Sequence, residues 1–146
     1  MSTVARFLRR DPAEVEPWAE TCGQIRPLIE EQDGAAAEVH HVEIDHARLH
    51  YHEKTDEVYY VIDGQGTMAL DDETIELHRG VVVYVPRGVR HKAVGKLTVL
   101  TVCIPRGVMD DLEVPCSSAS PDRPRLGWPA VARWGRIYRG ALPPKG

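Results

Sequence analysis

Apolar and polar residues alternate in short runs along the middle of the chain, with the period of two that is typical of half-buried β-strands. Residues that favour turns, chiefly glycine, proline and aspartate, separate these runs. The pattern predicts strands at residues 25–30, 36–44, 48–52, 57–62, 66–70, 73–78, 81–85, 91–94 and 97–104. Many short strands at regular spacing are typical of an all-β sandwich or barrel.

Two of the predicted turns decide how long the central strands are. Asp63-Gly64 and Gly95-Lys96 both carry turn-favouring residues between apolar runs. We therefore expect each of them to end one strand and to begin the next.

The two ends of the chain differ from its strand-rich middle. Seven of the 11 prolines lie from residue 105 onward, which largely excludes regular structure there, whereas Trp128 and Trp134 argue against a disordered tail. We expect an irregular N-terminal extension over residues 1–21 and a barrel domain over residues 22–105. We expect residues 106–146 to form a proline-rich extension that packs on the barrel or on a partner.

Length, charge and cysteine content narrow the class of protein. A chain of 146 residues with a net charge of -4 has the size of one domain and lacks the basic character of nucleic-acid-binding proteins. It has no apolar run near the ~20 residues that a membrane helix needs, and its N-terminus does not resemble a signal peptide. Its three cysteines, Cys22, Cys103 and Cys116, form neither a disulfide framework nor a Cys-x-x-Cys pair. We expect a cytoplasmic protein that binds neither nucleic acid nor membranes.

A cluster of potential metal ligands lies in the stretch from Leu49 to Gly66. On a strand, His50 and His52 point to the same face, about 6.6 Å apart along the chain. Glu57 follows after an odd step of five, so it rejoins the histidines only if the chain bends between them. The polar residues 53–56 make such a bend plausible.

The spacing of these residues resembles the first of two motifs found in metal-binding cupins. His50-x-His52 is followed after four residues by Glu57, and Gly64 follows after six more. Ile44 stands where that motif opens with glycine, which affects a backbone position and not a ligand.

A second stretch resembles the other cupin motif. It contains, in the order and spacing of that motif, Gly80, Pro86, Gly88 and His91. Gly95 stands where the motif closes with asparagine, again a backbone position. The resemblance covers about residues 44–95 and implies a double-stranded β-helix, or jelly-roll, barrel with one metal ion on His50, His52, Glu57 and His91.

Three imidazoles and one carboxylate are a mixed nitrogen and oxygen ligand set. Such a set suits one divalent transition metal ion (Fe, Mn, Ni, Zn, Co or Cu) and disfavours Ca²⁺ and Mg²⁺, which prefer mostly oxygen. Four protein ligands leave up to two positions open on a six-coordinate ion, so that a small-molecule ligand could bind directly. The alternative is a vestigial barrel without metal.

The other histidines suggest no comparable site. His41-x-Glu43 has the spacing that opens a facial triad of non-haem iron oxygenases, but no second motif completes it. An alternating strand with both side chains on one face explains it better. His40, His46 and His78 are interpreted as surface or strand decoration.

Tyr59 shares the face of Glu57 and is expected beside the ion inside the barrel. Its phenol is a candidate proton donor or acceptor, with a pKa lowered by the cation, and the alternative is a core tyrosine that lines the pocket. Lys54, Arg87 and Arg90 lie near the pocket mouth and are candidates for recruiting an anionic substrate. The alternative for these three is solvated loop charges.

Three functions remain open, because fold does not determine chemistry. The stretch that begins at Glu57 resembles sugar-phosphate-isomerase-like cupins and cupin lyases of sulfonium propionates, which implies an isomerase, epimerase or lyase. The likeness to mannose-phosphate isomerases is partial, because Glu53 stands where they tend to have arginine. The alternatives are an Fe(II)- or Cu-dependent dioxygenase and a non-catalytic binding module.

Val58, Tyr60 and Ile62 form an apolar stripe on the opposite face of the strand from Glu57. Covering such a stripe stabilises a protein by about 25 cal/mol per Å². We expect the chain termini or a second subunit to cover it. Cupins are often dimers, so the resemblance favours a symmetric homodimer.

Overall fold

The computed structural model describes residues 7–108 and 111–114 of the chain. These residues form nine strands and two short 3-10 helices. The strands are β1 (Trp18–Glu20), β2 (Gly23–Ile29), β3 (Glu38–His46), β4 (Tyr51–His52), β5 (Asp56–Leu70), β6 (Glu73–His78), β7 (Val82–Val85), β8 (His91–Ile104) and β9 (Leu112–Glu113). The 3-10 helices are η1 (Pro12–Glu14) and η2 (Glu31–Asp33).

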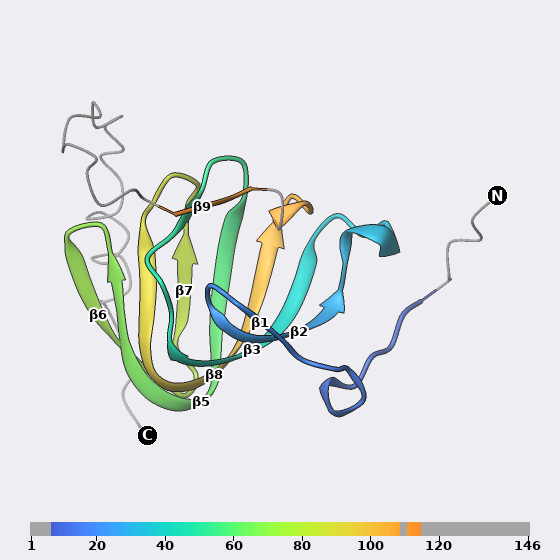
Figure 1. Ribbon diagram of the computed structural model, residues 1–146, viewed down its shortest axis with the longest axis horizontal. Coiled ribbons are helices and arrows are strands. Elements are labelled where there is room, and N and C mark those ends of the chain that lie inside the picture. The colour runs from blue at the N-terminus through green and yellow to red at the C-terminus, as the bar shows by residue number, and fades with distance from the viewer. Residues whose placement is uncertain (1–6, 109–110, 115–146) are drawn as a thin grey trace, which may run out of the picture.

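Seven strands form one antiparallel sheet in the order β1-β2-β3-β8-β5-β6, with β7 also paired to β5, and β4 pairs with β9 separately. Figure 1 shows this sheet rolled up, with β6 at one side, β1 and β2 at the other, and β5 and β8 curving along its base. The all-β barrel predicted from the alternating pattern is therefore confirmed. β1 and β9 had no signal in that pattern, because both are very short.

The predicted turns at Asp63-Gly64 and Gly95-Lys96 are wrong, because β5 and β8 continue through these positions. The register between the two strands shifts between Val61 and Asp63, which marks a β-bulge. Positive φ angles of 90° at Gly64 and 124° at Gly95 let the strands bend there without ending. The bends roll one sheet into a barrel.

The inner face of the sheet changes character from one end of the barrel to the other. One row across neighbouring strands is apolar: Val61, Val99 and Val42 are at most 1% exposed. The next row contains Tyr59, Thr101 and His40, and the row beyond it contains Glu57, Cys103 and Glu38. The buried polar groups thus gather at one end of an otherwise apolar core.

Of the interpretation of His40 as surface or strand decoration, the surface position is wrong. His40 is 5% exposed and lies on the inner face of β3, where Glu38, Val42 and Ile44 are also buried. The alternation of the strand, and not the polarity of the side chain, decides its position. His46 and His78 are exposed as expected, and His41 shares the outer face of β3 with Glu43.

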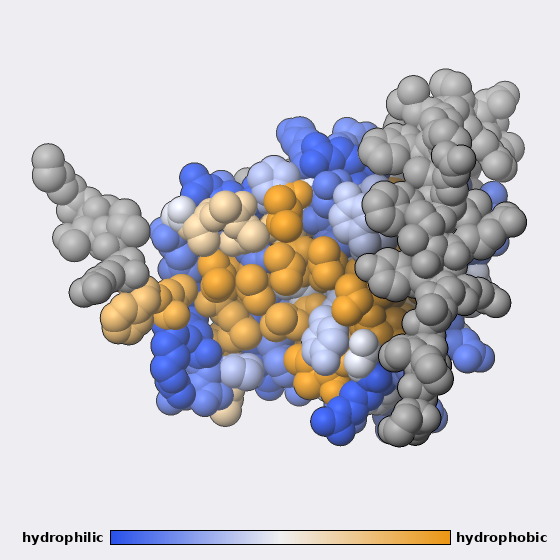
Figure 2. Space-filling view, turned by 180° about the vertical axis from the view of Figure 1, so that it is seen from behind, coloured by the Kyte–Doolittle hydropathy of each residue, from blue (hydrophilic) through white to orange (hydrophobic). Residues whose placement is uncertain are grey.

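The outer face of β5 and β7 carries exposed apolar side chains. Tyr60 is 44% and Ile62 37% exposed, and Val82 and Tyr84 on β7 are more exposed still. Figure 2 shows a broad hydrophobic area on the rear of the molecule. Within the described residues the predicted stripe is therefore uncovered, and its predicted cover from the C-terminal extension falls on residues 115–146, outside the described part.

The N-terminal segment is tied to the barrel by an ion pair. Arg10 Nη1 lies 2.6 Å from Asp33 Oδ2 and donates to the backbone oxygen of Leu28 at 2.7 Å. Hydrogen bonds from Arg10 and from the Glu30 backbone lower the pKa of Asp33 to about 2.

Among the described residues, no helix has the length and apolar character required to span a membrane.

Candidate metal centre

Backbone pairing brings two of the candidate ligands together. His91 is the first residue of β8, and His50 lies opposite it: His50 N–H donates to His91 O at 3.1 Å, and His91 N–H donates to His50 O at 2.8 Å. His52 follows on β4 with its side chain on the same side. Three imidazoles from two chain segments therefore face one space.

The bend expected before Glu57 is present, and a distant residue holds it. The backbone N–H groups of Glu53 and Lys54 donate to the carboxylate of Asp111 at 3.2 and 2.7 Å. The chain then enters β5, where Glu57 points inward and is 4% exposed. The sequence pattern predicts the bend but gives no sign of the contribution of Asp111.

The four side chains converge as their spacing predicts. His50, His52, Glu57 and His91 are all buried, and one possible ligand atom from each lies within 4.8 Å of the others. Oε2 of Glu57 lies 2.9 Å from Nε2 of His91 and 3.2 Å from Nε2 of His52. The cluster could therefore hold a single metal ion.

All three imidazoles turn the same nitrogen toward a backbone oxygen. Nδ1 of His50, His52 and His91 lies 2.8–3.0 Å from the carbonyl oxygens of Arg48, Asp111 and Val89, respectively. A carbonyl oxygen only accepts hydrogen bonds, so Nδ1 carries the ring hydrogen. In each neutral ring Nε2 then keeps a lone pair that faces the cluster, as in metal-ligating histidines.

At the centre of the cluster, the Nε2 lone pairs of neutral imidazoles therefore face the carboxylate oxygens of Glu57, so hydrogen-bond acceptors face one another. Nε2 of His52 is buried and makes no hydrogen bond within the described residues, although Glu57 lies close to it. Buried lone pairs that face a carboxylate repel it unless a cation lies between them. The donor set and this unpaired nitrogen fit a divalent transition metal ion.

The electrostatics of the cluster favour positive charge beside Glu57, which either a proton on an imidazole or a metal ion supplies. Burial and the neighbouring His91 lower the pKa of His50 to about 4, so this ring is neutral at physiological pH. Burial opposes ionisation of Glu57, but its contacts with His52 and His91 hold its pKa below the usual range. Burial also opposes charge on His52, yet Glu57 raises its pKa, so a proton and a metal ion compete for this nitrogen.

Tyr59 lies beside the cluster, as predicted. Its hydroxyl is 3.3 Å from Oε2 of Glu57 and 3.3 Å from Nε2 of His91, and the side chain is 2% exposed. Burial and the Glu57 carboxylate raise the pKa of Tyr59 well above its usual value, so the phenol keeps its proton. The lowering expected from a cation stays a prediction.

Two cysteines near the cluster have no signal in the sequence pattern. Sγ of Cys22 lies 3.5 Å from Nε2 of His50, and Sγ of Cys103 lies 3.6 Å from Oε1 of Glu57. Burial raises the pKa of both thiols, so neither is a thiolate at neutral pH. They line the cluster without adding a charged ligand.

The basic residues predicted at the pocket mouth lie outside the cluster. Arg87 is exposed and pairs with Asp56 at 3.0 Å, and Arg90 is exposed and lies 3.6 Å from Asp71. Lys54 is exposed in the bend before Glu57. A contact of these three residues with substrate stays a prediction.

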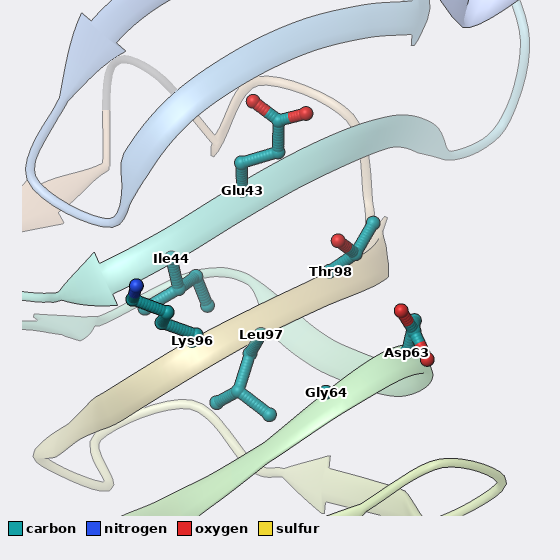
Figure 3. Close-up of a pocket in the computed structure, with 7 residues that line it drawn as sticks. All are labelled: Glu43, Ile44, Asp63, Gly64, Lys96, Leu97 and Thr98. Atoms are coloured by element: carbon teal, nitrogen blue, oxygen red, sulfur yellow. The ribbon is translucent and has the colours of Figure 1, made fainter.

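A hollow of about 350 Å³ lies elsewhere, where β3, β5 and β8 bend. In Figure 3 its charged side chains, Glu43, Asp63 and Lys96, do not converge on one point. Glu43 also pairs with Arg26 at 3.3 Å. This hollow therefore lacks the convergent groups of a functional site.

Comparison with known proteins finds one family model and two curated relatives that match part of the chain. Residues 38–104 match the family model described as "Cupin domain". An uncharacterised protein of Methanocaldococcus jannaschii is 35% identical over 57 residues, which are 38% of this chain and 46% of that protein. One of Streptomyces coelicolor is 51% identical over 37 residues, 25% of this chain and 35% of that protein. The matches thus span less than half of each curated relative.

Solved structures share the fold over most of their length. A protein from Planctomyces limnophilus has a TM-score of 0.71 at 27% identity, covering 76% of this chain and 99% of that one. A nucleoside dehydratase of Streptomyces has a TM-score of 0.63 at 18% identity, covering 80% and 99%. An ectoine synthase from P. lautus has a TM-score of 0.62 at 15% identity, covering 81% and 99%. At such identities the last two show a common fold alone.

Proposed function

We propose that this protein, whose residues 38–104 match the family model described as "Cupin domain", is a metal-dependent enzyme acting on a small oxygenated or anionic metabolite. The observation that carries the proposal is the set of three Nε2 atoms that face the Glu57 carboxylate in a buried space, each ring with its Nδ1 turned to a backbone carbonyl. Holding such a set without a cation costs free energy, so the arrangement is best explained by metal binding.

His50, His52, Glu57 and His91 would hold one ion of Fe, Mn, Ni, Zn, Co or Cu. When bound, such an ion supplies Lewis-acid polarisation of a substrate oxygen. The three Nδ1–H groups donate to backbone carbonyls and so orient the Nε2 atoms before a metal ion binds.

Tyr59 supplies the proton. Its hydroxyl is protonated, buried and within 3.3 Å of two of the ligand side chains, so it can donate to a substrate atom held at the same place. Proton transfer next to a polarised oxygen is the chemistry of isomerases, epimerases and lyases. Lys54, Arg87 and Arg90 are exposed basic residues that would attract an anionic group, although Arg87 and Arg90 each lie beside a carboxylate.

A second candidate is an Fe(II)- or Cu-dependent dioxygenase, because four protein ligands leave up to two positions for O₂ and substrate. The thiols of Cys22 and Cys103 weigh against it. Both lie within 3.6 Å of ligand atoms, where oxygen activation would expose them to oxidation. A non-catalytic binding barrel is the third candidate, and the protonated Tyr59 hydroxyl beside the ligand side chains favours catalysis over it.

We also propose a homodimer that buries the apolar outer face of β5, and a reducing compartment such as the cytoplasm. Cys22 and Cys103 are free thiols in the described part of the chain, which supports the second point.

The proposed function is tested on protein purified without added metal. We expect about one equivalent of a transition metal by elemental analysis. Any small molecule that copurifies is identified by mass spectrometry and used as substrate, with chelation and metal return as controls. Oxygen consumption during turnover would support the dioxygenase instead, and a bound ion with no proton-transfer activity would support the binding barrel.

A further inference from the structure

A second hollow, of about 300 Å³, opens on the inner side of the sheet edge, between β1, β2, η2 and β3. Its lining includes Glu38 and His40 of β3, Trp18 of β1, and Glu30 and Glu31 beside or in η2. None of the residues that line it is lysine or arginine. The hollow therefore carries negative charge without a built-in counterion among its walls.

Glu38 is the unusual group in this hollow. It is 3% exposed, and its Oε1 accepts a hydrogen bond from the Gly107 N–H at 2.8 Å. Its Oε2 is buried and accepts no hydrogen bond within the described residues. A buried carboxylate oxygen without a donor is costly, and native proteins rarely leave one.

His40 does not neutralise this carboxylate. Its Nε2 lies 3.6 Å from Oε2 of Glu38, beyond a good hydrogen bond. Burial lowers the pKa of His40 despite the nearby carboxylates, so the ring is neutral at physiological pH. Across the sheet, Cys103 directs its Sγ to Oε1 of Glu57 at 3.6 Å and does not donate to Glu38 Oε2 within the described residues.

The size and walls of the hollow favour an organic cation over a metal ion. A volume of about 300 Å³ is roughly ten times the share of one water molecule in the liquid. Glu30 already accepts a hydrogen bond from Gln32, so Glu38 is the buried carboxylate that remains available. Trp18, 42% exposed, adds an aromatic surface of the kind that attracts ammonium groups.

We propose that this hollow binds the primary ammonium group of a small organic molecule, with Glu38 Oε2 as acceptor and Trp18 beside the attached carbon chain. The site goes beyond the proposed function and does not require the metal. Glu38 and Glu57 both pair with Cys103 from opposite sides, so they lie two strands apart, about 10 Å, on one inner face. An ammonium-bearing substrate would reach the metal centre from this hollow only if the proposed function also holds.

The site is tested by titrating ¹⁵N-labelled protein with propylammonium chloride, 1-propanol and sodium chloride, followed by NMR. The Gly107 amide and the Trp18 indole N–H report on the hollow, because Gly107 donates to Glu38 and Trp18 lines the wall. We expect saturable shifts with propylammonium and an affinity about 10- to 100-fold higher than for 1-propanol, since a charged pair replaces a neutral one.

Glu38→Gln keeps an acceptor for Gly107 and removes the charge, so propylammonium should then bind no better than 1-propanol. Glu31→Gln is the matched control, because Glu31 lines the same hollow but is exposed. The affinity of this variant for propylammonium should stay within about threefold of the wild-type value. His52→Ala, which removes a ligand of the metal cluster, should leave propylammonium binding intact.

Three results would overturn the proposal. They are equal affinity for propylammonium and 1-propanol, the same shifts with sodium chloride, and undiminished binding in Glu38→Gln. The first two need only the wild-type protein, so the test stands even if Glu38→Gln does not fold. Loss of binding in folded His52→Ala would show that the hollow is not a separate site, whatever the outcome for the metal.

Discussion

Tyr59 donates its hydroxyl hydrogen to Oε2 of Glu57 across 3.3 Å, and both side chains are buried in the barrel. The two residues are neighbours on the inner face of β5, so the strand itself fixes the contact. A protonated phenol is thereby held beside a candidate metal ligand.

Replacing Tyr59 by phenylalanine keeps the packed ring and removes only the hydroxyl. If Tyr59 is the general acid, turnover should fall by about 10² to 10⁴ with metal content unchanged. Tyr60→Phe is the matched control, because Tyr60 lies on the outer face of the same strand. A rate unaffected in Tyr59→Phe would leave Tyr59 as a lining residue.

His52→Ala should abolish stoichiometric metal binding, because it removes the ligand nitrogen that has no other hydrogen-bond partner. The variant should stay folded, since the rolled sheet and its apolar core, and not the ion, carry most of the stability. Elemental analysis and circular dichroism measure the two quantities, with exposed His78→Ala as control. Full metal occupancy in His52→Ala would remove the ligand assignment.

The cluster was predictable because its members are close in the sequence or follow a spaced motif, and the bend at residues 53–56 has a polar, turn-like composition. Asp111, which holds that bend, accepts the amide hydrogen bonds of Glu53 and Lys54 from 58 and 57 positions away. No local pattern relates residues so far apart. The position of Cys22 and Cys103 beside the cluster was not predicted for the same reason.

The bends in β5 and β8 show another limit of local patterns. Gly64 and Gly95 favour a turn between strands and a bulge within a strand equally well. The decision comes from pairing: Gly64 lies opposite Leu97, so the two strands stay paired across the bend, with a one-residue shift in register. Such pairing is a property of the folded sheet and not of either segment.

Gly64→Ala should be far more destabilising than Gly80→Ala. Both residues have φ near 90°, so both substitutions cost about 1–2 kcal/mol of backbone strain. At Gly64 the new Cβ would also lie 2.0 Å from the Lys96 oxygen, whereas at Gly80 nothing lies within 4 Å. We expect a further loss of about 1–3 kcal/mol at Gly64 in urea unfolding. Equal losses would mean that the close approach of β5 and β8 is not required.

The Arg10–Asp33 pair predicts a pH dependence of stability. Folding lowers the pKa of Asp33 from 3.8 to about 2, so the unfolded state takes up a proton first as the pH falls. The stabilisation is fully present above about pH 4 and is lost as the pH falls toward about 2. The difference in unfolding free energy between wild type and Asp33→Asn should shrink over this window. Arg10→Met should weaken the same dependence, leaving the part that comes from the Glu30 N–H, and an unchanged profile there would contradict the assignment to this pair.

The uncovered face of β5 and β7 predicts self-association. Light scattering at micromolar concentration should give the mass of a dimer, because burying Tyr60, Ile62 and Val82 contributes about 25 cal/mol per Å². Tyr60→Glu should yield a monomer with unchanged metal content, whereas Thr67→Glu, exposed elsewhere on β5, should remain dimeric. Removal of residues 117–146 tests whether that segment contributes. A wild-type monomer whose stability survives the truncation would show that the face needs no cover.

β8 occupies the centre of the sheet and pairs with β3 on one side and β5 on the other, mostly with residues distant in the sequence, such as Glu38 with Cys103. Closing such long loops is entropically costly, and sheets built from non-local pairs fold slowly, in milliseconds to seconds. Glu57 and His91 meet only when β8 has docked against β5. The unfolded chain therefore has no assembled cluster, so binding of a metal ion would follow folding and would report its completion. A bound ion would then shift the equilibrium toward the native state by mass action, without acting as the nucleus around which the barrel forms.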